Sequence, residues 1–250
     1  MRDGFPRYHH PPVAWYKEWF GEEYLELYAH RDAGEAERHV DFVEQVLGER
    51  RPNAVLDLAC GAGRHTSALR ARGYRALGID LSKTLLAQSP RLPRVAGDMR
   101  SLPFADSSFD WVLNFFTSFG YFETEEENFH VLEEVARVLT PGGSLLIDIF
   151  NRDRVLADLK PADSSVINGQ PVEIERWYDN ETRRVNKRIR LVATEGRGRT
   201  FLESVRAYSV DEVSAGLERA GLTVRDRFGS FLGEPFERDS ERLILLAERG

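Results

Sequence analysis

The sequence is poor in the groups that most often bind metals or form covalent cross-links. Its 250 residues include one cysteine, Cys60, so an intramolecular disulfide is excluded. No histidine partner can be assigned to Cys60 from the sequence, and we interpret it as small filler rather than a nucleophile. The six histidines show no metal-ligand spacing with cysteine or carboxylate residues. The sequence therefore predicts no bound metal.

Long apolar runs and an excess of positive charge are also missing. No stretch resembles a membrane span or a secretory leader, and together with the single cysteine this predicts a cytoplasmic protein without a membrane partner. The 34 basic and 41 acidic residues give a net charge of −7. This charge argues against a whole-surface attraction to nucleic acid and leaves only a local basic patch for that purpose.

What the chain does contain is a regular alternation of short apolar runs and helical segments. The apolar runs lie at 54–58, 76–79, 95–97, 111–115 and 144–150. The helical segments lie at 64–72, 82–88 and 125–139. Strand, helix and strand repeated in this way are typical of an α/β fold, in which a mostly parallel sheet is covered by helices on both faces.

The pattern changes after this alternation and then returns. Between 170 and 208 we expect two or three strands, because apolar and polar residues alternate there with a period of two. A helix at 209–220, followed by strands at 223–228 and 243–247, indicates that the main sheet then resumes. The sequence thus predicts an antiparallel β insertion after the fifth strand.

We expect three parts in the chain. Residues 1–33 are predicted to form an arm and one aromatic helix, residues 34–150 and 209–250 the core, and residues 151–208 the insertion, as a cover over the site or a dimer contact. The aromatic helix carries on one face Trp15, Trp19, Phe20, Tyr24, Leu27 and Tyr28. This face is either a lid that excludes water from a ligand or a packing surface.

A tight turn with two glycines follows the first apolar run of the core. In V-L-D-L-A-C-G-A-G-R-H-T (55–66), Asp57 stands in the predicted strand, and Gly61 and Gly63 follow just beyond its end. Ligands of open parallel sheets bind beyond the carboxyl ends of the strands. Glycines there let the backbone approach a ligand closely, and the N-terminus of the next helix favours a negative group.

Two classes of ligand compete for such a turn, namely dinucleotides and S-adenosylmethionine (SAM). The dinucleotide fingerprint needs a small residue where this chain has Thr66, which weakens that interpretation. Asp80, at the end of the next apolar run, suits the ribose diol of either class. Asp98 in G-D-M-R favours SAM, because an acid there can accept a hydrogen bond from an adenine amino group, with Leu81 and Met99 flanking the ring.

Taken in order, these motifs resemble those of class I SAM-dependent methyltransferases. The resemblance rests on D-L-A-C-G-A-G-R-H-T, G-I-D-L, G-D-M-R-S-L-P-F, F-D-W-V-L-N-F-F-T-S-F-G-Y-F and V-L-T-P-G-G-S-L-L-I-D, which together span about residues 53–150. It implies a seven-stranded sheet of order 3-2-1-4-5-7-6 with the last strand antiparallel. It also implies SAM as the cofactor and S-adenosylhomocysteine as the product.

The resemblance assigns roles to individual residues. The residues that it implies for cofactor binding are Asp57, Ala59, Gly61, Gly63, Asp80, Leu81, Asp98, Met99, Asn114 and Phe115. The turn from Ala59 to Gly63 is expected to contact the methionine part, with Asp57 orienting it. Asp80 is expected on the ribose and Asp98 on the adenine. Asn114 and Phe115 are expected under the sulfonium.

The segment N-F-F-T-S-F-G-Y-F (114–122) is the predicted acceptor platform. It resembles the same segment of small-molecule N-methyltransferases, including those that act on amino sugars attached to nucleotides, where the place of Tyr121 can hold a histidine. We expect Tyr121 to position the acceptor. Methyl transfer by in-line displacement depends above all on orientation. A neutral amine needs no general base, whereas a hydroxyl acceptor would need one.

The leading hypothesis is an enzyme that moves a methyl group from SAM to a nitrogen or oxygen of a small molecule. One alternative is an RNA (tRNA) methyltransferase that uses the basic insertion, and another is a non-catalytic SAM-binding protein on the same fold. The insertion is made locally basic by Arg183, Arg184, Lys187, Arg188, Arg190, Arg197 and Arg199. A solvated sheet face explains them more simply than a phosphate-binding surface, so nucleic acid is not the expected partner. The sequence leaves a homodimer open.

Overall fold

The computed structural model describes residues 14–28, 33–48, 51–192 and 198–250. The helices in these ranges are α1 (Tyr16–Trp19), α2 (Glu22–Leu27), α3 (Ala33–Leu47), α4 (Arg64–Ala71), α5 (Lys83–Ala87), α6 (Glu125–Val138), α7 (Arg152–Ala157) and α8 (Val210–Arg219). The strands are β1 (Val55–Leu58), β2 (Ala76–Asp80), β3 (Arg94–Ala96), β4 (Phe109–Asn114), β5 (Leu139–Phe150), β6 (Ala162–Ile167), β7 (Gln170–Asp179), β8 (Arg184–Leu191), β9 (Arg199–Arg206), β10 (Leu222–Phe228) and β11 (Arg242–Arg249). None of the helices in these ranges is long and apolar enough to cross a membrane.

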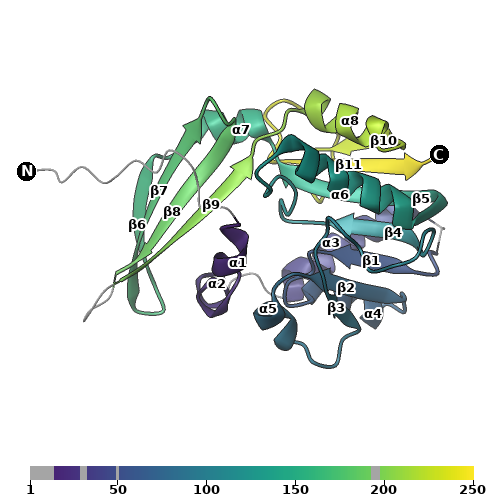
Figure 1. Cartoon of the computed structure of the whole chain (residues 1–250), viewed down its shortest axis with the longest axis horizontal. Coiled ribbons are helices and arrows are strands. Elements are labelled where there is room, and N and C mark those ends of the chain that lie inside the picture. The colour runs from purple at the N-terminus through teal and green to yellow at the C-terminus, as the bar shows by residue number, and fades with distance from the viewer. Residues whose placement is uncertain (1–13, 29–32, 49–50, 193–197) are drawn as a thin grey trace, which may run out of the picture.

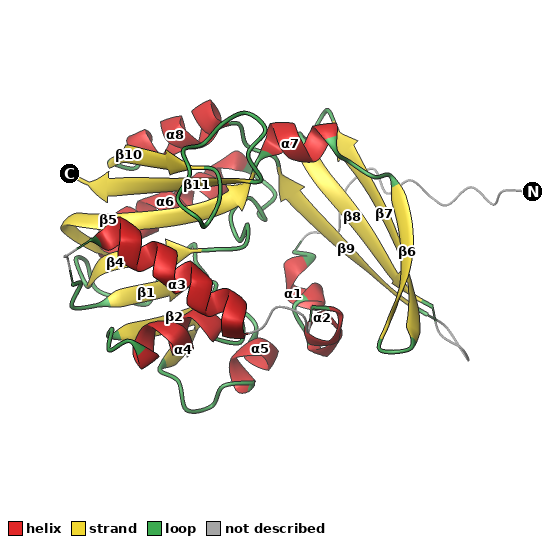
Figure 2. Ribbon diagram, turned by 180° about the vertical axis from the view of Figure 1, so that it is seen from behind, coloured by secondary structure: helices red, strands yellow, loops and turns green. Residues whose placement is uncertain are grey.

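Seven strands form the main sheet, in the order β3-β2-β1-β4-β5-β11-β10. The first five pair in parallel, whereas β11 runs antiparallel to both β5 and β10. Because β10 and β11 are the sixth and seventh strands of this sheet along the chain, the predicted order 3-2-1-4-5-7-6 is confirmed. Helix α6 covers the near face of the sheet in Figure 1, and α3 covers the opposite face, which is nearest the viewer in Figure 2.

Both faces of the main sheet are buried, as its continuous apolar runs predict. Leu56 and Leu58 of β1 belong to the core cluster that includes side chains of α6 and α8. Val55 belongs to the second cluster, with side chains of α3 and α4. Asp57 is buried as well and, by alternation along the strand, lies on the face of α3 and α4. This double packing fixes the carboxyl end of β1, from which the glycine turn leaves.

The second sheet is an antiparallel meander of four strands, β6-β7-β8-β9. The expectation of two or three strands between 170 and 208 is confirmed by β7, β8 and β9, whereas β6 precedes that range and was not predicted. Most of β6 is exposed, and its residues A-D-S-S-V-I lack the alternation of apolar and polar residues on which the prediction relied. As an edge strand that packs little apolar surface, β6 is formed by its pairing with β7 rather than by its own pattern.

The expected single aromatic helix is wrong, because the chain forms two short helices there. Helix α1 ends at Trp19, and Gly21 takes an extended conformation (φ −123°, ψ −155°) before α2 begins. The break lets Trp15 and Trp19 both pack against the second sheet, in a cluster with Ile189 and Phe201. Figure 1 shows α1 and α2 between the second sheet and α5.

Candidate functional site

The glycine turn depends on backbone conformations that favour glycine. Ala59, Gly61 and Gly63 all lie in the left-handed region, with φ values of 60°, 57° and 81°. A Cβ atom on Gly63 would come within 2.9 Å of Leu92 Cδ1. Gly63 is also the N-cap residue of α4. The turn therefore directs the N-terminus of α4 and its free N–H groups toward the carboxyl edge of the sheet.

Asp57 holds this helix to β1. Its Oδ2 accepts hydrogen bonds from the backbone N–H of Thr66 (2.9 Å) and from the Thr66 hydroxyl (2.6 Å). Complete burial raises the pKa of Asp57 to about 6, although the hydrogen bonds from Thr66 lower it. Asp57 thus orients the turn through α4.

Asp80 ends β2 and faces the same turn. Its Oδ2 accepts a hydrogen bond from the N–H of Gly61 (2.8 Å) and its Oδ1 one from the N–H of Ser82 (2.8 Å). Burial raises the pKa of Asp80, and these backbone hydrogen bonds oppose the shift. Since a carboxylate offers about four lone-pair positions, both oxygens of Asp80 can accept a further hydrogen bond from the cavity that Asp80 lines.

Leu81, Asp98 and Met99 line the cavity beside Asp80. Leu81 is 38% exposed, which is unusual for a leucine here and leaves an apolar surface open to a ligand. Asp98 pairs with Arg100, whose Nη2 lies 2.6 Å from Asp98 Oδ2. Although burial opposes the shift, the hydrogen bonds from Arg100 lower the pKa of Asp98. Asp98 is therefore ionised, and Arg100 uses part of its hydrogen-bonding capacity.

The end of β4 reaches the cavity with Phe115 but not with Asn114. The buried side-chain amide of Asn114 donates a hydrogen bond to the carbonyl oxygen of Leu58 (3.0 Å), which ties the end of β4 to the end of β1. Phe115 is 4% exposed and lines the cavity. Of the ten residues expected to bind the cofactor, Asn114 and Gly63 are not among those that line the cavity.

A single large cavity of about 1080 Å³ joins the glycine turn to the second sheet. One end is formed by the turn and the ends of β2 and β4, and the other by α1, α2 and the strands β7, β8 and β9. Ser82 bridges these parts, because its hydroxyl donates a hydrogen bond to the carbonyl oxygen of Phe20 (2.6 Å) while its N–H binds Asp80. A bound molecule at Asp80 would therefore touch residues that hold α1 in place.

Tyr121 lies in the wall of this cavity among aromatic rings of α1 and its flanks. Its ring is nearly parallel to those of Phe20 (centroids 5.8 Å apart) and Tyr16 (6.4 Å), and it meets Trp15 edge-on at 4.9 Å. These contacts close the cavity with apolar surface on the side of the acceptor platform.

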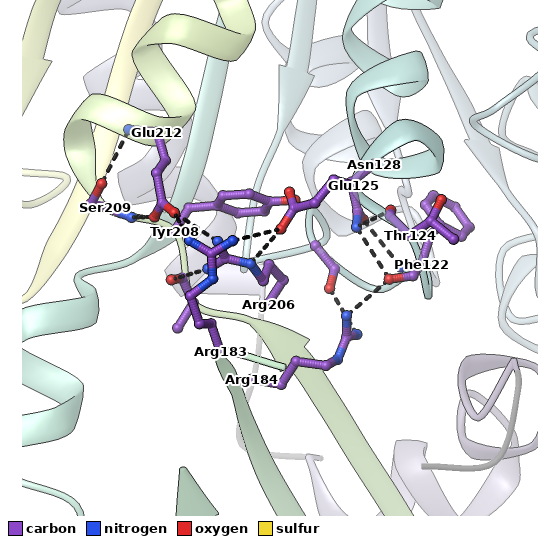
Figure 3. Close-up of polar contacts among 12 residues, drawn as sticks. Phe122, Thr124, Glu125, Asn128, Arg183, Arg184, Arg206, Tyr208, Ser209 and Glu212 are labelled. Atoms are coloured by element: carbon purple, nitrogen blue, oxygen red, sulfur yellow. Dashed lines mark hydrogen bonds and ion pairs between the residues drawn. The ribbon is translucent and has the colours of Figure 1, made fainter. Parts of the chain in front are cut away.

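A buried arginine holds the acceptor platform to the second sheet. Arg184 of β8 donates hydrogen bonds to the carbonyl oxygens of Gly120, Tyr121 and Phe122 at 2.9–3.1 Å, and to Ser204 of β9. Arg184 is 6% exposed. Figure 3 shows this contact beside a second network, in which Arg206 and Tyr208 both bind Glu125. None of these residues stands out in the sequence, since their partners lie far along the chain.

Two further pairs support the site and were not predicted. Asp148 accepts a hydrogen bond from the N–H of Phe116 (2.7 Å) and pairs with Arg242 (2.7 Å), so it holds a turn in which Phe116 and Thr117 have φ values of 61° and 56°.

Among the residues that the structure describes, no group of three histidine, cysteine or acidic side chains could hold a metal ion.

The second unpredicted pair consists of two buried histidines. Nδ1 of His39 lies 3.0 Å from Nε2 of His65, and His65 lines the cavity. Burial lowers the pKa of His39 to about 4 and that of His65 well below its ordinary value. Both rings are therefore neutral near pH 7, and one donates its proton to the other.

Comparisons with known proteins agree with this geometry. Residues 56–147 match the family model described as a methyltransferase domain. A cypemycin N-terminal methyltransferase from a Streptomyces species is 30% identical over 204 residues, which cover 78% of this chain and 82% of that relative. The chain spans about half the length of the next curated methyltransferases that it matches, 56% and 45%.

Two solved structures have the same fold. A SAM-dependent methyltransferase from Clostridium acetobutylicum superposes with a TM-score of 0.77 at 19% identity, covering 91% of this chain and 96% of the other. A sugar N-methyltransferase from a Streptoalloteichus species superposes with a TM-score of 0.71 at 22% identity, covering 100% and 98%. Both coverages include the second sheet's part of the sequence as well as the core.

Proposed function

The chain belongs to the SAM-dependent methyltransferases, with SAM as its cofactor, and from this premise we propose that it methylates the nitrogen of a small-molecule amine held beneath α1 and α2. The carrying observation is the single cavity that joins the glycine turn to the aromatic rings and to the second sheet. The relatives named for N-terminal and sugar N-methylation support a nitrogen as the acceptor atom.

The residues at the core end of the cavity fit this cofactor. When bound, SAM supplies a methyl group on an electrophilic sulfonium. We propose that Asp80 accepts hydrogen bonds from the ribose hydroxyls with its remaining lone pairs, and that Leu81 and Met99 contact the adenine. Asp98 would accept from the adenine amino group beside its pair with Arg100. Asp57 would act on the turn rather than on the ligand, because Thr66 occupies its oxygen.

A nitrogen acceptor is favoured over a hydroxyl by the low basicity of the histidine at the cavity, while Asp57, whose pKa is about 6, is hydrogen-bonded to Thr66. A hydroxyl needs a general base with a pKa near the working pH. His65 is the histidine that lines the described cavity, and burial lowers its pKa well below the ordinary value while His39 occupies its Nε2. An amine that enters in its neutral form needs only to be oriented, a task that we assign to Tyr121 and the rings of α1.

The division of the chain follows from the same proposal. The core of residues 34–150 and 209–250 would bind the cofactor, and the insertion of residues 151–208 would form the far wall of the acceptor pocket. Helices α1 and α2 would exclude water from the reaction. A cytoplasmic location remains a prediction from the sequence, which leaves a homodimer open.

Calorimetry and a product assay test this proposal. We expect SAM to bind wild-type protein, and Asp80→Ala to weaken binding about tenfold or more, because two charge-assisted acceptor positions are lost. Asp226→Ala, at an exposed position of β10, is the control. A panel of amines and matching alcohols should then give S-adenosylhomocysteine with amines alone. Unchanged SAM affinity in Asp80→Ala, or turnover only with alcohols, would contradict the proposal.

A further inference from the structure

A row of charged side chains crosses the inner face of the second sheet. Arg176 of β7 stands opposite Lys187 of β8, and Lys187 stands opposite Glu203 of β9. Directly opposed residues of antiparallel strands share one face. All three line the cavity, with side chains 24%, 19% and 21% exposed respectively.

This row lies between two rows that carry no charge. The row on one side consists of Ile174, Ile189 and Phe201, and the row on the other of Tyr178, Val185 and Val205. Placing charged groups on a half-buried apolar face costs free energy unless they have partners. Like charges on directly opposed residues, as in Arg176 and Lys187, add to that cost.

The outer face of the same strands has a simpler arrangement. There two cations stand opposite acids, with Arg188 2.6 Å from Glu175 and Arg190 3.3 Å from Glu173. None of these four residues lines the described cavity. Arg184 and Arg206, farther along these strands, are also opposed, but both are buried and Arg206 is paired with Glu125 and Glu212.

The partners of the inner row occupy Lys187, which also donates to the hydroxyl of Tyr28, but leave side-chain donors of Arg176 unused within the described part of the chain. Glu203 accepts a hydrogen bond from the hydroxyl of Tyr28 (3.2 Å) and lies 3.4 Å from Lys187 Nζ, so its charge is held on the far side of Lys187 from Arg176. Arg176 donates from Nη1 to Asp163 (3.0 Å). Among the residues that the structure describes, the other side-chain N–H groups of Arg176 make no hydrogen bond, although a guanidinium offers five.

We propose that Arg176, assisted by Lys187, binds an anionic oxygen group of the acceptor, a carboxylate or a phosphate. This inference rests on the proposed function, since it names the chemistry of the same acceptor. The acceptor is then an amine that also carries a negative group, with the amine directed to the core end of the cavity and the negative group to the second sheet. A guanidinium fork binds either kind of anion with two parallel hydrogen bonds.

Binding to the protein loaded with S-adenosylhomocysteine tests this assignment without requiring turnover. The probes are glucosamine, glucosamine 6-phosphate and 2-amino-2-deoxygluconic acid, which share an amine and differ in charge, measured by calorimetry at constant ionic strength. We expect at least one anionic probe to bind about tenfold or more tightly than glucosamine. Arg176→Gln should abolish that preference, Arg176→Lys should retain part of it, and the outward-facing control Arg190→Gln should leave it intact.

The outcomes separate this inference from the proposed function. The anion that is preferred, phosphate or carboxylate, identifies the acceptor's class. If neither anion binds more tightly than glucosamine, or if Arg176→Gln keeps the preference, the inference is wrong while the proposed function stands. If S-adenosylhomocysteine itself does not bind, the proposed function fails first.

Discussion

At the scale of single residues, the neutral pair His39 and His65 makes stability depend on pH. Each histidine binds a proton more readily in the unfolded chain, where its pKa is ordinary, than in the folded protein, where burial lowers it. The folded state therefore loses stability as the pH falls below about 6.5. The positive charges of three arginines also lower the pKa of His39, whereas the negative charge of Glu35 raises it. The arginines are Arg64, Arg242 and Arg38.

We predict that His39→Gln flattens this pH dependence. A glutamine can still hydrogen-bond His65 but does not titrate, so between pH 6.5 and 4 the wild type should lose up to roughly 3 kcal/mol relative to the variant. Urea denaturation at a series of pH values measures the difference. Asp57 contributes to the pH dependence of stability with the opposite sign, because its pKa is raised to about 6. That contribution is the same in both proteins and cancels in the comparison. His130→Gln, at an exposed site of α6, is the control, and parallel pH curves for His39→Gln and wild type would refute the prediction.

Asp148 and Arg242 carry a second prediction at this scale. Asp148 is fully buried and its carboxylate depends on Arg242 for its charge partner. Arg242→Met should therefore destabilise the protein by roughly 3–5 kcal/mol. Adding Asp148→Asn should restore part of the loss, because the asparagine oxygen can still accept the N–H of Phe116 without a buried charge. Denaturation of both variants gives the values, and strictly additive effects would count against the pair.

Such residue-level contacts mark the limit of what the sequence predicts. Asp57, Asp80 and the glycines could be placed because each stands at the end of an apolar run, where a parallel sheet exposes its ligand edge. Asp148 and Arg242 are 94 positions apart, and no local pattern pairs them. Asn114 belongs to an expected motif, yet its amide ties β4 to β1, a contact that only the three-dimensional register reveals.

At the scale of elements, the sequence predicts strands that carry their own hydrophobic pattern and misses those that do not. The core strands and α6 were expected from their apolar patterns, and the structure adds a capping box at Thr124 that begins α6. The edge strand β6 and the break at Gly21 were not, because pairing with β7 and packing on the second sheet determine them. Tertiary contacts outweigh local preference at both places.

The link between the two sheets gives a prediction about Arg184. Its side chain donates to the acceptor platform and to β9, so Arg184→Met should leave several buried carbonyl oxygens without donors and cost about 3 kcal/mol or more. Because these bonds lie at the platform and away from Asp80, the KM for the acceptor should rise while the Kd of SAM stays near the wild-type value. Denaturation, calorimetry and steady-state kinetics provide the three readings.

Arg188→Met is the matched control for Arg184→Met. Arg188 lies on the same strand, faces outward and pairs with Glu175 near the surface, so its loss should cost about 1 kcal/mol or less. If Arg184→Met weakened SAM binding as much as acceptor binding, the platform would not be the part that Arg184 positions. Arg184→Lys keeps a cation with fewer donors and should lie between Arg184→Met and wild type.

At the scale of the whole molecule, the distribution of charge bears on the RNA alternative. Six cations that make the insertion locally basic bind within the chain: Arg183 to Glu212, Lys187 to Glu203, Arg188 to Glu175, Arg190 to Glu173, Arg199 to Glu23, and Arg184 to neutral oxygens. Arg197 lies outside the described residues. With a net charge of −7 around them, these paired cations offer a phosphate backbone little to neutralise.

We therefore predict that the protein has no measurable affinity for tRNA near physiological salt. Affinity for a nucleic acid backbone depends on unpaired cations and falls steeply with salt concentration as counterions return. The variant Glu173→Gln with Glu175→Gln removes the carboxylates that pair with Arg190 and Arg188 on the outer face. It should acquire weak, salt-dependent binding, which shows that the assay can detect such an interaction. Fluorescence anisotropy with labelled tRNA over a range of salt concentrations compares the two proteins. Wild-type binding that is as strong and as salt-dependent as the variant's would contradict the prediction. The cations of the insertion would then bind RNA even though they are paired within the chain.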